Sequence, residues 1–141
     1  MSGRPGESEE WVSDWVEKAE LDFRAAEYLL TMGRRCPFGI VCYHAQQCVE
    51  KYIKALLVHM GVSFPWTHDI GDLVSLLPAG TDIPLDEREQ ELLTAYAALS
   101  RYPGPLEAPG PERAEEAVKL ARRVRRAIRK ALSTRKTAKG A

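Results

Sequence analysis

Five polar side chains share one face of a predicted central helix and are the first candidates for chemistry in this sequence. Residues 42–57 follow an uninterrupted helical pattern, in which positions three and four apart lie on the same face. The opposite face, from Cys42 to Met60, is apolar. The polar face indicates either a polar contact between helices or a ligand-binding surface. Its members are His44, Gln47, Glu50, Lys51 and Lys54.

The tripeptide Arg101-Tyr102-Pro103 is a second candidate. Pro103 disfavours helical geometry at Tyr102, so both preceding residues are placed at the end of a predicted helix. A guanidinium suits phosphate binding, and a phenol ring suits stacking on a base. A structural role also fits, in which Arg101 complements the negative helix C-terminus and Tyr102 closes the end of a bundle.

His68 and Asp69 open a short predicted helix, with Asp69 as a plausible N-cap and His68 as a latch for the preceding loop or part of a site. A metal site from His44, Cys48 and Cys42 lacks a fourth ligand at a suitable spacing. The sequence contains no Glu-x-x-His motif, Gly-rich phosphate loop or nucleophile elbow. It therefore predicts no metal site and no cofactor.

The elements that must position these residues are all predicted to be helices. Apolar residues recur with helical spacing over about 11–32, 37–60, 85–100 and 112–132, with a short helix over about 69–77. Gly33, Gly61 and the Pro/Gly-rich run from Tyr102 interrupt the pattern. We therefore predict an all-α chain: an antiparallel up-down four-helix bundle with a short additional helix. Residues 1–8 are predicted to be a flexible N-terminus, 9–134 the bundle, and 135–141 a basic flexible tail.

The charge of the chain is balanced overall but unevenly distributed. Twenty basic residues face twenty acidic ones, yet from Lys119 onward there are ten basic residues and no acid. This asymmetry indicates nucleic-acid contact, docking on an acidic partner, or packing of a basic last helix beside the acidic first one. Three cysteines, no apolar leader and no apolar run of membrane-spanning length predict a cytoplasmic protein.

Taken together, these residues resemble the HEPN family (higher eukaryotes and prokaryotes nucleotide-binding domain) over about residues 11–132. The resemblance rests on Trp15-x3-Ala19-x2-Asp22, the run from Tyr43 to Leu57, His68-Asp-Ile-x2-Leu73, and Leu99-Ser-Arg-Tyr-Pro103. It implies an antiparallel helical bundle that dimerises. In prokaryotes such proteins are commonly encoded beside a minimal nucleotidyltransferase, as a toxin–antitoxin module, and many members are metal-independent RNases.

The RNase activity of the family depends on an Arg followed by a His after four to six residues. Arg101 is the candidate arginine here, but Leu106, Glu107 and Ala108 occupy the expected histidine positions, and no histidine follows His68. The general acid–base group expected from the family is therefore missing, which argues against an enzyme.

We accordingly expect a dimeric HEPN-like protein that binds a nucleotide or nucleic-acid phosphate and associates with a nucleotidyltransferase-type partner. The expected site is a mouth formed by Arg101 and Tyr102 and approached from the central helix, with His68 at its rim. Its helix members are His44, Gln47, Glu50, Lys51 and Lys54. The alternatives are an RNase toxin that uses Arg101 with a displaced histidine, and a non-catalytic interaction module whose polar face is a dimer seam.

Overall fold

Helices account for all the regular structure in the part of the chain that the structure describes. The computed structural model describes residues 5–99 and 108–140, and side chains over 9–99 and 108–133. The elements are α1 (Pro5–Leu30), the one-turn 3-10 helix η1 (Gly33–Arg35), α2 (Phe38–His59), α3 (Ile70–Ser75), α4 (Glu87–Tyr96) and α5 (Pro111–Gly140). The predicted all-α class is confirmed.

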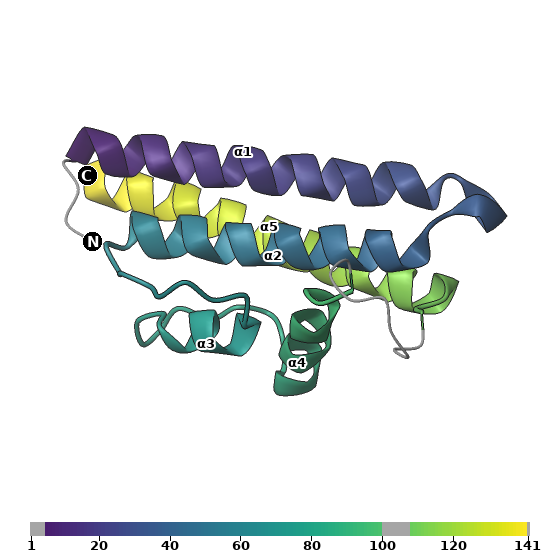
Figure 1. The fold of residues 1–141 in the computed structure, drawn as a ribbon. Helices are drawn as coiled ribbons and strands as arrows, with labels where there is room; N and C mark the ends of the chain where they lie inside the picture. The colour runs from purple at the N-terminus through teal and green to yellow at the C-terminus, as the bar shows by residue number, and fades with distance from the viewer. Residues whose placement is uncertain (1–4, 100–107, 141) are drawn as a thin grey trace.

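Helix α2 lies at the centre of the fold. Figure 1 shows α1 running antiparallel along one side of it and α5 along another, while α3 and α4 cover a third side. The predicted apolar face of α2 is buried: Cys42, Ala45, Val49, Ile53 and Leu56 are each at most 1% exposed. Fully burying a side chain of the size of leucine contributes about 1.5–3 kcal/mol. This face is therefore the main reason that α1, α2 and α5 pack together.

Helix α5 contributes the second large part of the core. Five residues of its predicted apolar stripe are buried, and two are partly buried. The stripe consists of Ala117, Leu120, Ala121, Val124, Ile128, Ala131 and Leu132. Because these residues recur every three or four positions, the remaining faces of α5 are left to its charged residues.

Local signals fix several helix ends. Asp69 is the N-cap of α3, as predicted, and its Oδ1 accepts a hydrogen bond from the Asp72 backbone N–H at 2.8 Å. At α4, Asp86 and Glu89 form a reciprocal capping box. Gly33 and Gly61 follow α1 and α2 with φ of +65° and +72°, a conformation that glycine adopts without steric cost.

Three boundaries depart from the sequence prediction. Helix α1 begins at Pro5, ahead of the helix predicted from about residue 11, because proline is favourable in the first turn of a helix. Helix α5 continues to Gly140, beyond the end predicted at about residue 132, because the added residues include Arg, Lys and Ala, which favour helix, and no proline.

The third departure is the length of α4. The sequence predicts a helix over 85–100, but α4 spans only Glu87–Tyr96. Beyond it, the backbone N–H groups of Ala97, Ala98 and Leu99 bond three residues back, which tightens the last turn. Among the described residues, three helices are therefore long (α1, α2 and α5), rather than the four that the sequence predicts. None of the described helices combines the length and apolarity needed to cross a bilayer.

Candidate functional site

A buried polar network surrounds Glu50 in the middle of α2. Glu50 is 2% exposed and Lys54, one turn later, is 3% exposed. The Lys54 Nζ donates to Glu50 Oε2 at 2.9 Å, and Gln46 Nε2 donates to Glu50 Oε1 at 2.9 Å. His68 Nδ1 lies 2.8 Å from Glu50 Oε1, which attaches the segment before α3 to α2.

These contacts determine the charge of Glu50. Burial by itself raises the pKa of a carboxyl group, but the hydrogen bonds from Lys54, His68 and Gln46 outweigh it and hold the pKa of Glu50 below its ordinary value. Glu50 is therefore an ionised carboxylate paired with the ammonium of Lys54 inside the protein.

Lys54 also lies among aromatic rings. Its Nζ is 5.3 Å from the ring centroid of Trp15, 5.4 Å from that of Trp66 and 5.8 Å from that of Phe64. A cation over an aromatic face is stabilised by the ring quadrupole, more strongly when water is excluded. The Lys54 ammonium is thus engaged by a carboxylate and by three aromatic rings.

Asp22 on α1 organises a second polar network with the other half of the predicted face. His44 Nδ1 lies 2.8 Å from Asp22 Oδ1, and Lys51 Nζ donates to Asp22 Oδ2 at 2.6 Å. These contacts join α1 to α2 and engage both predicted site residues with one carboxylate.

A third network joins α1 to α5 through Glu20. The Nε and Nη2 of Arg125 donate to its two carboxylate oxygens at 2.6 Å and 2.8 Å, a bidentate pair, and the Tyr52 hydroxyl donates to the same group. The hydrogen bonds of Arg125, followed by that of Tyr52, lower the pKa of Glu20 from 4.5 to about 2 despite partial burial. Burial and the neighbouring Glu20 raise the pKa of Tyr52 to about 12.

The structure thus divides the predicted polar face into two networks. Glu50, Lys54 and His68 are together, and Gln47 joins them because its Nε2 donates to Gln46 Oε1 at 2.7 Å. His44 and Lys51 belong instead to Asp22. Arg101 and Tyr102, the predicted mouth of the site, lie outside the described residues.

Sequence reasoning did not assign a role to Gln46, Glu20 or Asp22. Gln46 is fully buried, and the two acids of α1 are partners of cations on α2 and α5. Nothing in the local sequence names these partners, because they lie more than twenty residues away along the chain.

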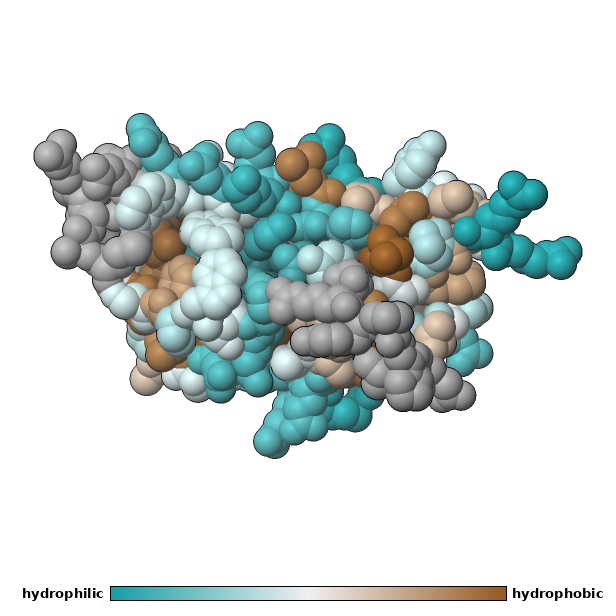
Figure 2. Space-filling view, viewed as in Figure 1, coloured by the Kyte–Doolittle hydropathy of each residue, from teal (hydrophilic) through white to brown (hydrophobic). Residues whose placement is uncertain are grey.

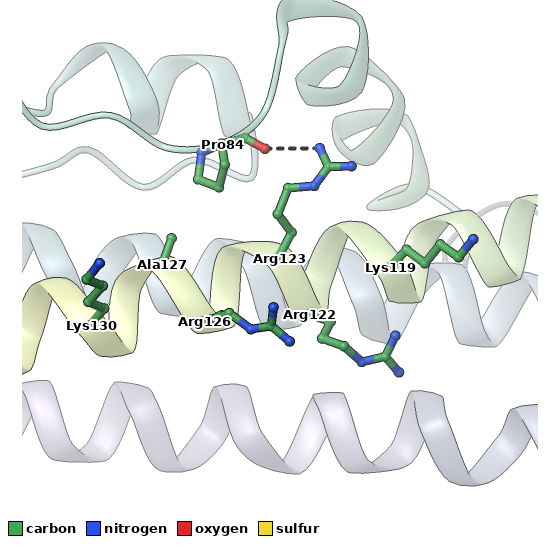
Figure 3. A pocket seen from close by; sticks show the side chains of 7 residues that line it. All are labelled: Pro84, Lys119, Arg122, Arg123, Arg126, Ala127 and Lys130. Carbon is green, nitrogen blue, oxygen red and sulfur yellow. Dashed lines mark hydrogen bonds between the residues drawn. The ribbon is translucent and has the colours of Figure 1, made fainter.

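A shallow hollow along α5 differs from these networks because every charged residue that lines it is basic. Its volume is about 510 Å³, and no acidic residue lines it. Figure 3 shows its basic side chains spread along the exposed side of α5, with Arg123 reaching the carbonyl of Pro84. The lining residues are Pro84, Lys119, Arg122, Arg123, Arg126, Ala127 and Lys130.

Three of these five cations have no ionic partner among the side chains that the structure describes. Arg122 pairs with Glu27 at 2.9 Å and Arg123 with Glu89 at 3.1 Å, and both arginines are exposed. Lys119, Arg126 and Lys130 are exposed, and within residues 9–99 and 108–133 no carboxylate lies within ion-pair distance of them. We call the five cations of this hollow the α5 basic face.

The spacing of the basic residues brings them to one side of the helix. Lys119, Arg122 or Arg123, Arg126 and Lys130 follow one another at three or four positions, the interval that repeats one helical face. This interval is visible in the sequence, which predicts a basic C-terminal region but does not by itself place its residues in one site. Arg122 and Arg126 also border a neighbouring hollow, but that one contains Glu20 and Glu27.

The cysteines do not add a reactive or metal-binding group to this surface. Cys36, Cys42 and Cys48 are free and buried. Burial raises the pKa of Cys42 to about 11 and that of Cys48 further above its ordinary value, so both are thiols near neutral pH. No group of three or more His, Cys, Asp or Glu able to hold a metal occurs among the described residues.

The arrangement of helices and the polar networks of α2 can be compared with known proteins. A family model of the HEPN domain matches residues 12–132. The chain belongs to the HEPN domain family. The family resemblance inferred from Trp15, Asp22, the α2 run and His68 is therefore confirmed, with nearly the same boundaries.

Two solved structures are similar to this HEPN chain. TT1696 from Thermus thermophilus is 28% identical, with a TM-score of 0.70, over 84% of this chain and 96% of that one. ST0689, described as an archaeal HEPN homologue, is 24% identical with a TM-score of 0.59, over 86% of this chain and 97% of that one, a likeness of fold. No curated protein matches the sequence.

Proposed function

We propose that this HEPN protein binds the phosphate backbone of a nucleic-acid strand along the α5 basic face. The observation that carries the proposal is a hollow lined by five cations and no carboxylate, in which Lys119, Arg126 and Lys130 have no described ionic partner. Phosphate contacts by Lys and Arg supply most of the affinity of sequence-independent nucleic-acid binding.

The length of the face favours a strand over a single nucleotide. From Lys119 to Lys130 the helix rises by about 16 Å, at 1.5 Å per residue. A stacked strand places one phosphate about every 3.4 Å, so on the order of five phosphates fit this length. One phosphate group reaches only part of the same stripe.

The composition of the hollow favours nucleic acid over an acidic protein. Protein interfaces usually have an apolar centre with aromatic anchors, surrounded by a polar rim. Here only Pro84 and Ala127 are apolar, and arginine forks are the main feature. No base-reading pocket is part of the hollow, so we expect little dependence on sequence.

The lysines on the polar face of α2 are already paired with carboxylates, which favours α5 over α2 as the phosphate-binding surface. Lys51 lies 2.6 Å from Asp22 and Lys54 lies 2.9 Å from Glu50, so a phosphate would have to compete with a carboxylate for each ammonium. The participation of Arg101 and Tyr102 stays a prediction. On the α5 basic face, Lys119, Arg126 and Lys130 face no such competition from a described carboxylate.

Binding without cleavage is the proposed outcome for RNA. Two of the three histidines, His44 and His68, each direct Nδ1 at a carboxylate, 2.8 Å away in both cases. Both serve contacts within the fold, and the position expected for the family's catalytic histidine after Arg101 holds none. We expect RNA to stay intact after incubation with the protein.

The wider assembly also stays a proposal. We infer from the family that the chain forms a homodimer and associates with a minimal nucleotidyltransferase in a toxin–antitoxin-like module. The free, buried cysteines are consistent with work in the reducing environment of the cytoplasm. Copurification from the native host, followed by identification of the bound chains, tests the partner.

Fluorescence anisotropy with labelled single-stranded RNA and DNA tests the binding function. In low salt, the double variant Arg126→Glu/Lys130→Glu is expected to lose about tenfold or more in affinity for both strands. The matched control, Arg34→Glu/Arg35→Glu, reverses the same number of exposed charges on η1, outside the hollow, and should stay within about twofold of the wild type. Equal losses of affinity in the two variants would show that binding depends only on net charge and not on the α5 basic face. Absence of binding by the wild type would overturn the proposal.

A further inference from the structure

All three tryptophans of the chain lie at one corner of the molecule, where the first turns of α1 meet the segment that follows α2. Trp11 and Trp15 belong to α1. The rings of Trp15 and Trp66 both lie near the ammonium of Lys54, which places Trp66 close to Trp15. Trp66 is 87% exposed and Trp11 is 37% exposed. Indole rings left exposed to water are typical of an interaction surface. We call this surface the tryptophan corner.

An apolar pocket of about 410 Å³ opens at the tryptophan corner. Its lining is mostly carbon, and its volume suits one large side chain. Figure 2 shows brown and pale side chains gathered at the end of the molecule where α1 begins. The lining residues are Trp11, Asp14, Trp15, Lys18, Val58 and Phe64.

The walls of the pocket are held in place from inside the protein. Trp15 and Phe64 meet edge to face, with ring centroids 6.4 Å apart. The ammonium of Lys54 lies near both rings and is itself fixed to Glu50 at 2.9 Å. The pocket therefore requires little ordering when a ligand enters, which lowers the entropic cost of binding.

The charge around the pocket identifies the kind of ligand. Asp14 and Lys18 line it, and the exposed acids Glu10 and Glu17 lie four and three residues from Asp14 on the same side of α1, where Lys18 is the one base. The positive N-terminus of α1 accounts for acids only near its first turn, and Asp14 and Glu17 lie well beyond it. An acidic rim repels phosphate and attracts lysine and arginine.

We propose that the tryptophan corner docks a segment of a partner protein that carries one aromatic or aliphatic side chain flanked by basic residues. The apolar side chain enters the pocket and packs on Trp11, Trp15 and Phe64. The flanking basic residues lie against Asp14 and Glu17. This surface is distinct from the α5 basic face in its residues and in the charge of its ligand.

Intrinsic fluorescence tests the proposal directly, because every tryptophan of the chain is at the corner. The probe is a capped pentapeptide with phenylalanine between two pairs of lysines. Two comparison peptides replace the phenylalanine by alanine or the lysines by glutamate. We expect a saturable change in emission with the first peptide, and binding about tenfold weaker or worse for each comparison peptide.

Variants of the full chain locate the binding. Trp11→Ala and Asp14→Lys, both at exposed positions, should each weaken binding of the lysine–phenylalanine peptide about tenfold while circular dichroism stays unchanged. Tyr28→Ala removes a 74%-exposed aromatic residue of α1 outside the corner and should leave binding unchanged. No response at millimolar peptide, equal binding of the glutamate peptide, or a response to AMP that Trp11→Ala abolishes would each overturn the proposal.

Discussion

Glu50 is the residue on which the centre of the molecule depends most. It is almost fully buried and accepts hydrogen bonds from Lys54, Gln46 and His68. Hydrogen bonds from three donors offset the cost of removing the Glu50 carboxylate from water. If Glu50 were replaced, the buried Lys54 ammonium would have no such compensation. The interior of the fold therefore depends on this one acid more than on any exposed ion pair.

Replacing Glu50 tests that dependence. Glu50→Gln keeps the shape of the side chain but leaves the Lys54 ammonium buried without an anion, so we expect a loss of about 3–5 kcal/mol in the free energy of unfolding. Glu27→Gln, which breaks the exposed pair with Arg122, should cost about 1 kcal/mol or less. Urea denaturation measures both. A Glu50 variant as stable as the Glu27 variant would contradict a stabilising role for the buried network.

The acids of the networks also predict how stability depends on pH. The pKa of Glu20 is lowered to about 2, and that of Glu50 lies below its ordinary value. Acids with a depressed pKa in the folded state stabilise it above the unfolded pKa of about 4.5, and this contribution is lost as the pH falls through the folded pKa. We expect the free energy of unfolding to decrease between about pH 4.5 and 2.

The variant Glu20→Gln isolates one part of this effect. It removes the titrating group that Arg125 and Tyr52 hold, so the decrease in stability on acidification should be shallower than in the wild type. Urea titrations at several acidic pH values measure the slope. An identical slope in both proteins would show that Glu20 has the same pKa in the folded and unfolded chain.

Residue spacing predicts a polar face on α2 but not its partners. His44, Gln47, Glu50, Lys51 and Lys54 do lie in polar contacts, as the helical interval indicates. That Glu50 and Lys54 are buried while Lys51 reaches the surface depends on Trp15, Phe64 and Asp22, which come from other elements. Periodicity along one helix contains no information about these distant neighbours.

At the scale of elements, the sequence predicts the number and type of helices better than their ends. The central helix agrees within one residue at each end because a proline and a glycine flank it. Helix α4 is shorter than predicted because its last turn tightens before the proline that was expected to stop it. Such a change results from packing of the chain and has no local sequence signal.

The N-cap of α4 gives a prediction at this scale. The Asp86 side chain accepts from the Glu89 backbone N–H at 2.8 Å, and the Glu89 side chain accepts from the Asp86 backbone N–H at 2.9 Å. Asp86→Ala leaves the Glu89 N–H without its side-chain acceptor and should lower the free energy of unfolding by about 1 kcal/mol. The control is Asp82→Ala, which replaces an exposed acid in the preceding loop that does not cap α4, and it should change stability little. Thermal denaturation distinguishes them, and equal melting temperatures would contradict the capping role.

At the scale of the whole molecule, a net charge of zero conceals two surfaces of opposite character. The α5 basic face has five cations and no lining acid, whereas exposed carboxylates predominate at the tryptophan corner. Charge separation of this kind directs different partners to different faces. Composition predicted the asymmetry, but only the packing of α5 on α2 shows which of its basic residues share one exposed hollow.

The salt dependence of strand binding tests the central claim most directly. Each phosphate contact contributes about −0.7 to the slope of log affinity against log salt for a single strand. Contacts by the three unpaired cations, Lys119, Arg126 and Lys130, therefore predict a slope of about −2.1, and Arg126→Glu/Lys130→Glu should make it shallower by about 1.4 or more. The control Arg34→Glu/Arg35→Glu should keep the wild-type slope. An unchanged slope in the α5 variant, with a shallower one in the control, would contradict binding at the α5 basic face.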